Sequence, residues 1–405
     1  MTSSESSPRL ISPRPWRALG LAATLGGALL SASACNGDVG GGSPLDDVVE
    51  QAEEDGNDER VPTGEGVEGT VLDERVIDYG EALKTMHIKL LDMPPPLSKI
   101  KRIVDASDPQ VEYEAMVDEA FEDPRFTQRV IRWWRDTLRQ GGGALNTAPT
   151  FAARVLVEGQ PYQNLFTATE NTCPSYDGDT GTFVDGNCDN GVPEHAGVLT
   201  NPGSMSQFYG NMAFRRVRWI QEIFACKKFP AEYSDTPVDK GEAQYTAPWP
   251  FEALATEPID FQDTSAVVCA NCHATMNRLA PLFANFDEDG MWQGGIAVET
   301  PTAPDPVTTE LSHWLQAGEE TAWRYGVPVA DLPELGAAMA GDPTVKGCLT
   351  ARLWNFTMSK EDIVAGLATV PAEVIEPYMN ALNDNGGDMK AALKMMFKSE
   401  DFVSF

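Results

Sequence analysis

Basic residues are scarce in this chain. Its 405 residues include 30 Lys and Arg against 61 Asp and Glu, a formal net charge of −31. A protein binds nucleic acid by neutralising phosphates with clustered cations, which releases counterions. A polyanion without basic clusters would repel DNA and RNA, and it has no basic face for an anionic membrane surface. The composition therefore excludes nucleic acid as a partner.

Long apolar runs and familiar enzyme motifs are also missing. The apolar run from Ala18 to Leu30 has 13 residues, fewer than the ~20 needed to cross a bilayer. There is no P-loop, GxGxxG or HExxH motif and no Ser-His-Asp order, so hydrolase and nucleotide-binding functions have no support. Acidic pairs such as Asp287 and Asp289 resemble glycosidase carboxylates, but 61 acids produce such pairs by chance.

Helical periodicity dominates what is present, since convincing alternating strands are scarce. Apolar side chains recur at spacings of three and four residues, which predicts amphipathic helices. The first two stripes are Leu83, Met86, His87 and Leu90, and Tyr113, Met116, Val117, Ala120 and Phe121. Asp123-Pro124 predicts the start of a helix that carries Phe126, Val130, Trp133 and Thr137 on one side. Ser359 with Asp362 resembles a capping box, and Asp388 precedes a stripe of Met389, Leu393, Met396 and Phe397. The predicted fold class is mainly α.

The N-terminus indicates export. Residues 1–34 combine three arginines, the short apolar run and small residues ending at Ala34, which is typical of a secretory signal peptide. The small residues before Cys35 resemble a bacterial lipobox, although Ala32 stands where leucine is usual. The resemblance implies lipidation of Cys35 and a lipid anchor at the outer membrane, with the chain periplasmic or extracellular. Ordinary cleavage after Ala34 is the alternative.

An acidic segment follows. Residues 36–66 hold ten acidic residues and one basic residue, with almost no large apolar side chains. Such a segment cannot repay its ordering entropy by burial, so residues 35–70 are predicted to be a flexible tether. We expect an N-terminal helical domain over 71–235 and a cytochrome c-like haem domain with C-terminal helices over 236–405.

The strongest chemical motif is Cys269-Ala-Asn-Cys272-His273. Two thiols three positions apart can reach the two vinyl groups of a haem, and the next histidine can reach the iron, so CxxCH predicts covalent c-type haem attachment. The predicted export is consistent with c-type haem attachment, because bacteria attach this haem outside the cytoplasm. The alternatives are a disulfide between Cys269 and Cys272, a zinc site, which needs further ligands, and a thioredoxin-like motif, which needs a βαβ pattern.

The motif's surroundings resemble uncharacterised cytochrome-like domain families of planctomycetes and myxobacteria. The CxxCH…NFDxxGxW pattern from Cys269 to Trp292, the block from His195 to Thr200, and the block from Arg216 to Cys226 are similar to those families. The helices from Tyr79 to Leu138 and the end from Cys348 to Phe402 resemble their first and last helical parts. Departures include Asn277-Arg278 in place of Asp-Pro, Ala284 for Glu and Met291 for Arg. The resemblance implies an architecture and a haem cofactor rather than a reaction.

Four cysteines remain once Cys35, Cys269 and Cys272 are set aside. An even remainder in an oxidising compartment suggests two disulfides. Of the three connectivities we favour Cys173 with Cys188, closing a short polar loop, and Cys226 with Cys348, joining the two halves. That short loop is rich in acids and glycine. Its carboxylates at alternate positions could offer oxygens to Ca²⁺, although the EF-hand pattern is incomplete and a solvated acidic loop is the alternative. The candidate ligands are Asp177, Asp179, Asp185 and Asp189.

The second axial position of the haem decides its chemistry. His195 or Met291 are the leading candidates, ahead of His313 and other methionines. A low-spin haem suits electron transfer to a redox partner protein at the cell envelope, which is the function we expect. An open position would instead suit a haem peroxidase or oxidase component. A third hypothesis is a surface binding scaffold in which haem is structural.

Overall fold

The computed structural model describes residues 75–227, 262, 267–293, 297–298, 306–324, 326–360 and 370–405. The chain divides into two units, Met1–Glu68 and Gly69–Phe405, and all described residues belong to the second. The expected signal peptide, Cys35, the tether and the boundary at 235/236 lie outside the described residues. Within the second unit, α9 from the expected N-terminal domain packs against α11 and α13 from the expected haem domain.

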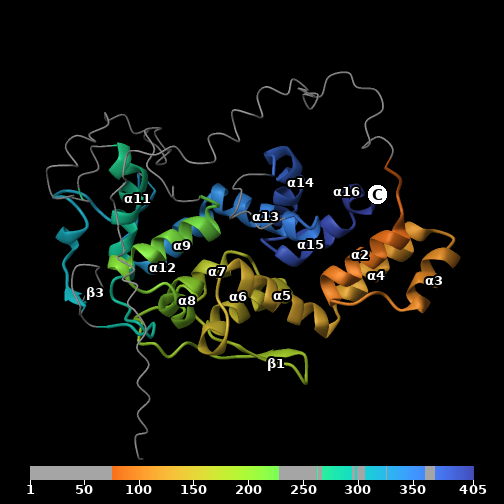
Figure 1. Cartoon of the computed structure of the whole chain (residues 1–405), viewed down its shortest axis with the longest axis horizontal. Helices are drawn as coiled ribbons and strands as arrows, with labels where there is room; N and C mark the ends of the chain where they lie inside the picture. The colour runs from red at the N-terminus through yellow and green to blue at the C-terminus, as the bar shows by residue number, and fades with distance from the viewer. Residues whose placement is uncertain are drawn as a thin grey trace, which may run out of the picture. The chain divides into compact units, whose positions relative to one another are not determined.

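The described part is mainly helical, as the periodicity predicts (Figure 1). Its helices are α2 (Tyr79–Leu91), α3 (Leu97–Asp105), α4 (Pro109–Phe121), α5 (Pro124–Thr137), α6 (Thr147–Val157), α7 (Asn164–Thr167), α8 (Pro202–Gln207), α9 (Phe214–Phe224), α11 (Val267–Phe283), α12 (Leu332–Gly341), α13 (Pro343–Thr357), α14 (Ala372–Asp384), α15 (Met389–Phe397) and α16 (Glu400–Val403). Single 3₁₀ turns are η1 (Gly143–Asn146), η2 (Gly197–Thr200), η3 (Asn211–Ala213) and η4 (Leu311–His313). The strands form short antiparallel pairs: β1 (Ser175–Asp177) with β2 (Thr182–Val184), β3 (Ala297–Val298) with β4 (Val307–Thr308), and β5 (Ala322–Arg324) with β6 (Val327–Pro328).

Aspartate caps begin several of these helices, because a side-chain oxygen can accept from backbone N–H groups that have no partner within the helix. Asp123 accepts from the Arg125 N–H at the start of α5, with proline at the first helical position as predicted. Asp388 likewise caps α15. The stripes predicted for α2, α4 and α15 are all buried.

One helix turns slightly further than expected. The buried side of α5 carries Trp134, which is 1% exposed, whereas the predicted Trp133 is only partly buried. Trp133 contacts Phe356 of α13, with ring centroids 5.7 Å apart. Both adjacent tryptophans contact apolar side chains, so the spacing of apolar residues does not decide which of the two is more deeply buried. The predicted capping box is not described, since Asp362 lies outside the described residues.

The first described residues of the second unit meet its C-terminal residues. Ile77 and Ser404 form an antiparallel bridge, and Val76 and Phe405 exchange two backbone hydrogen bonds of 3.0 Å. Figure 1 shows the C-terminus beside α16 and the start of α2. Helix α16 therefore packs on α2, and the core includes residues of both.

The predicted disulfides are both present. Cys173 bonds to Cys188, and Cys226 bonds to Cys348 across a sequence separation of 122. The first closes the loop that contains the β1–β2 hairpin, and the second ties the end of α9 to α13. Two disulfides are compatible with an extracytoplasmic chain.

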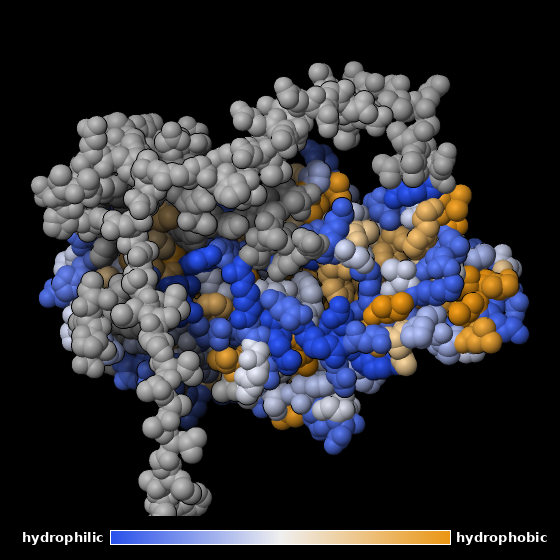
Figure 2. Space-filling view, viewed as in Figure 1, coloured by the Kyte–Doolittle hydropathy of each residue, from blue (hydrophilic) through white to orange (hydrophobic). Residues whose placement is uncertain are grey.

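Apolar side chains are not confined to the interior. Leu97, Val104 and Val111 are each more than 60% exposed, and Figure 2 shows apolar side chains gathered over α2, α3 and α4. Among the helices the structure describes, none has both the length and the apolar character needed to cross a bilayer.

Candidate functional site

Helix α11 carries the CxxCH motif. Positions 269, 272 and 273 are related as i, i+3 and i+4, so in a helix they share one face. Cys272 and His273 are partly buried, whereas the side chain of Cys269 lies outside the described residues. The helix therefore presents the second thiol and the imidazole of the motif from consecutive positions.

The imidazole of His273 is oriented by its own helix. Its Nδ1 lies 3.1 Å from Oδ1 of Asn277, one turn further on, and Asn277 is only 3% exposed. An amide oxygen can only accept, so Nδ1 carries the proton in this hydrogen bond. The same tautomer places the lone pair on Nε2, the atom that would bind a metal. Metal-binding histidines commonly donate their other N–H to such a partner.

Burial also keeps His273 neutral. Desolvation lowers the pKa of His273, and the hydrogen bond to Asn277 partly offsets this. Iron binds the neutral imidazole, so a lowered pKa removes competition from protons. The tautomer, the charge state and the shared helix face fit a covalent haem.

Phe214 of α9 packs against the same imidazole. The two rings are T-shaped, with centroids 5.3 Å apart. Phe214 follows η3, in which Asn211, Met212 and Ala213 all have positive φ, between 49° and 62°. Left-handed backbone costs roughly 1–2 kcal/mol for each such residue. The indole N–H of Trp314 donates to the Met212 carbonyl at 3.1 Å, which helps hold this strained turn beside α11.

A buried arginine positions the other end of α11. Arg216 is 1% exposed and donates to the backbone carbonyls of Met205, Phe283, Phe286 and Asp287 at 2.6–3.1 Å. Phe283 ends the helix, where carbonyls lack partners and the helix dipole is negative. Arg216 has no ion-pair partner among the described residues, and burial lowers its pKa to about 10. It therefore remains a cation that fixes α11 to α8 and α9.

Sequence reasoning did not identify Asn277, Phe214 or Arg216 as positioning residues. Asn277 was noted only as a departure from the family pattern, although its i+4 spacing from His273 was a usable signal. Phe214 lies 59 positions before His273, and nothing in the sequence indicated that the two rings meet.

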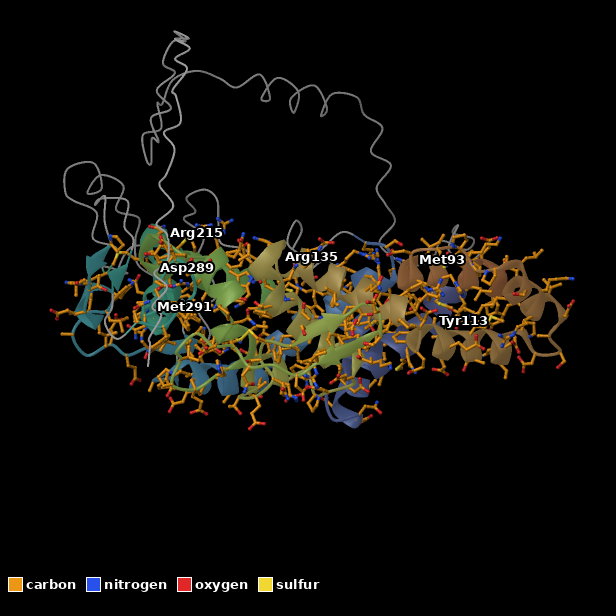
Figure 3. All side chains as sticks on the ribbon, turned by 90° about the horizontal axis from the view of Figure 1, so that it is seen from below. Met93, Tyr113, Arg135, Arg215, Asp289 and Met291 are labelled. Carbon is orange, nitrogen blue, oxygen red and sulfur yellow. A yellow bond between two sulfur atoms is a disulfide. The ribbon has the colours of Figure 1, made fainter. Side chains whose placement is uncertain are left out.

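The candidates for the second axial position occupy other places. Burial lowers the pKa of His195, and its buried Nδ1 has no hydrogen-bond partner among the described residues. Met291 is 37% exposed in the turn beside Asp289 (Figure 3), and its N–H donates to Asp287. Exposed His313 accepts from the Glu310 N–H in the capping box of η4. None of the described contacts joins these three side chains to His273, so the second ligand stays a prediction.

The acidic loop is a hairpin whose carboxylates face different partners. Asp177 accepts from the backbone of Asp179 and Thr180 in the turn, while Asp185 pairs with Arg154 at 2.7 Å. Asp179 and Asp189 are exposed. In the ranges the structure describes, no three His, Cys, Asp or Glu residues gather closely enough to hold a metal ion. The four aspartates are thus not brought together.

Gly197, in the block from His195 to Thr200, and Gly290, in the NFDxxGxW pattern, each lie against the backbone of another segment. A Cβ on Gly197 would lie 2.1 Å from the Leu165 carbonyl oxygen, and one on Gly290 would lie 2.3 Å from that of Pro202. Both glycines have positive φ. Only glycine fits at either position, which explains its place in each motif.

Comparison with known proteins gives no further evidence about the fold or function of this chain. No family model matches the chain, and no curated protein or solved structure is significantly similar to it. The likeness to cytochrome-like families rests on the motifs alone.

Proposed function

We propose that this protein is an electron-transfer protein of the cell envelope that carries one covalent haem on α11. The observation that carries the proposal is the imidazole of His273, held by Asn277 in the tautomer whose lone pair is on Nε2, the atom that would bind a metal. Cys269 and Cys272 would supply the thioether bonds. A haem bound there would supply a one-electron iron couple.

The protein's own residues have separate roles in this proposal. Asn277 holds the Nδ1 proton and so fixes the ring orientation. Phe214 covers one edge of the imidazole and limits its contact with water. The left-handed turn before Phe214 and the Arg216 contacts fix α9 and α11 relative to one another, and a rigid setting lowers the reorganisation that accompanies electron transfer.

The envelope location is supported by the disulfides and the N-terminal sequence. Two structural disulfides are compatible with an oxidising compartment, where such bonds persist. Lipidation of Cys35, and a redox partner protein at the membrane, remain part of the proposal.

The first test is covalent haem. The exported protein should keep its haem through denaturation and acid-acetone extraction, and it should give the reduced spectrum of a c-type haem in alkaline pyridine. Cys269→Ser with Cys272→Ser should release the haem. Extraction of all haem from the wild type would contradict the proposal.

Asn277→Leu tests the orienting hydrogen bond. The variant should keep its covalent haem but should bind ferrous carbon monoxide at least tenfold more readily, because carbon monoxide could displace a His273 ring that is no longer held. Thr275→Val is the matched control, since position 275 lies about 200° around α11 from His273. A wild type that is already high-spin and turns over peroxide would favour the peroxidase alternative instead.

A further inference from the structure

A second site lies at the far end of α11. A cavity of about 460 Å³ opens between the last turn of α11, the segment after the first disulfide and the start of α12. Ligand sites for small molecules span about 300–1,000 Å³. None of the CxxCH side chains that the structure describes lines this cavity, and Pro281 follows His273 by eight positions, about 12 Å along a helix.

The walls of the cavity are apolar and held in place. Pro193, Pro281 and Pro333 line it, together with Leu282 and Trp292. Trp292 is held by two contacts. Its backbone N–H donates to the Asn190 carbonyl at 2.7 Å, and its ring packs edge-on against Phe286.

The supports behind this wall are buried as well. Asn190 is 1% exposed and donates to the carbonyls of Thr200 and Gly290. The segment before it is tied by the disulfide between Cys173 and Cys188. Proline rings, a disulfide and buried amide contacts leave this wall few ways to collapse, so the cavity is preformed.

The charged residues that line the cavity, among those described, are all acidic. Glu194 and Asp331 line it, and no Lys, Arg or His does among the described lining residues. Neither carboxylate has an ion-pair partner in the part of the chain that the structure describes. Asp331 uses one oxygen to cap α12, accepting from the Glu334 N–H, and is exposed. Arg278 of α11 is paired with Glu319 and so does not offset them.

We propose that this cavity binds a small organic cation with an apolar body, of the arylalkylamine kind. The prolines, Leu282 and Trp292 would hold the body, and an indole face attracts a cation. Glu194 and Asp331 would favour an ammonium group, and they would repel a carboxylate of the same shape. The amide of Asn285, which also lines the cavity, offers a further polar contact. This site does not depend on the proposed haem.

Three probes that share a phenyl ring and have similar size test the charge argument. Binding of 2-phenylethylamine, 2-phenylethanol and phenylacetate to the full-length protein can be compared by titration calorimetry at low salt. The amine should bind roughly tenfold tighter than the alcohol, and the carboxylate should bind weakest. Equal affinities, or no binding of the amine at millimolar concentration, would overturn the proposal.

Charge-removing variants distinguish the effect of the two lining carboxylates from the effect of the protein's overall negative charge. Glu194→Gln with Asp331→Asn should reduce the preference for the amine to within twofold and leave the alcohol unchanged, because asparagine still caps the helix. The matched control is Glu288→Gln with Asp289→Asn, which removes two exposed charges that do not line the cavity; Asp289 is labelled in Figure 3. An equal loss of preference in the control would also refute the site. Ala330→Trp, at the exposed edge, should abolish binding of all three probes.

Discussion

At the scale of single residues, His87 is a buried imidazole that makes no hydrogen bond. It is 2% exposed on α2, and neither ring nitrogen has a partner in the described part of the chain. The pKa of His87 is lowered to about 4, first by burial and then by the charges of Lys99 and Arg125, against opposing effects of Asp123 and Glu119. The periodicity placed His87 correctly on the buried stripe, where it acts as an apolar residue.

The pKa of His87 predicts acid sensitivity. The unfolded chain binds this proton below pH ~6.5, whereas the folded chain binds it only near pH 4. Stability should therefore fall as the pH drops from about 6.5 to 4, by up to about 3 kcal/mol at ~1.4 kcal/mol per pKa unit. His87→Leu should remove this slope and raise stability at pH 7 by about 1 kcal/mol. Urea unfolding across this pH range measures both, and an unchanged slope in the variant would show that other groups cause it.

At the scale of elements, α11 depends on contacts that come from α9. Arg216→Met would remove the arginine donor from four backbone carbonyls. Those of Phe283 and Asp287 also accept from backbone N–H groups, so the cost of about 1–3 kcal/mol for a buried unsatisfied group applies to those of Met205 and Phe286. After partial relaxation, we expect a loss of about 3–5 kcal/mol in the free energy of unfolding.

Arg215→Met is the control for Arg216→Met. Arg215 is exposed (Figure 3) and makes one described hydrogen bond, to the Tyr209 carbonyl, so its loss should cost less than about 1 kcal/mol. Denaturant unfolding compares the two variants. Equal costs would mean that the carbonyl contacts of Arg216 contribute little.

Helices could be predicted from the sequence where buried apolar residues recur with the helical period. The stripe from Leu83 to Leu90, the cap at Asp123 and the stripe after Asp388 all follow from local spacing and capping chemistry. The motif on α11 was also visible in the sequence. Its surroundings were not, because Phe214 and Arg216 act through contacts with residues 59 to 71 positions away. Such contacts depend on how helices pack, which local patterns do not encode.

At the scale of the whole molecule, the two disulfides should stabilise unequally. A bridge stabilises chiefly by restricting the unfolded chain, more for a longer loop. The separations are 122 and 15 residues, so removing Cys226–Cys348 with two serines should cost about 2 kcal/mol more than removing Cys173–Cys188. Denaturant midpoints of the two double variants make the comparison. A larger cost for the short loop would show that local packing outweighs chain entropy.

Counting the cysteines predicted two disulfides, and the short polar loop favoured this pairing among the three possible connectivities; the structure shows the favoured one. The acidic hairpin was less predictable. Alternating carboxylates suit a cation, but Asp177 and Asp185 find backbone and arginine partners that the sequence did not indicate. Composition limits what a segment can bind, and the fold decides which of its side chains meet.

The bond between Cys226 and Cys348 makes a covalent ring of the chain between them, and the CxxCH motif lies inside that ring. A protease that cuts one peptide bond anywhere in this interval cannot separate the two fragments. The nicked protein would run at its full mass on a denaturing gel until a reductant is added. In a compartment with proteases and no reductant, the segment between the two cysteines can be cut once without any part of the molecule being lost.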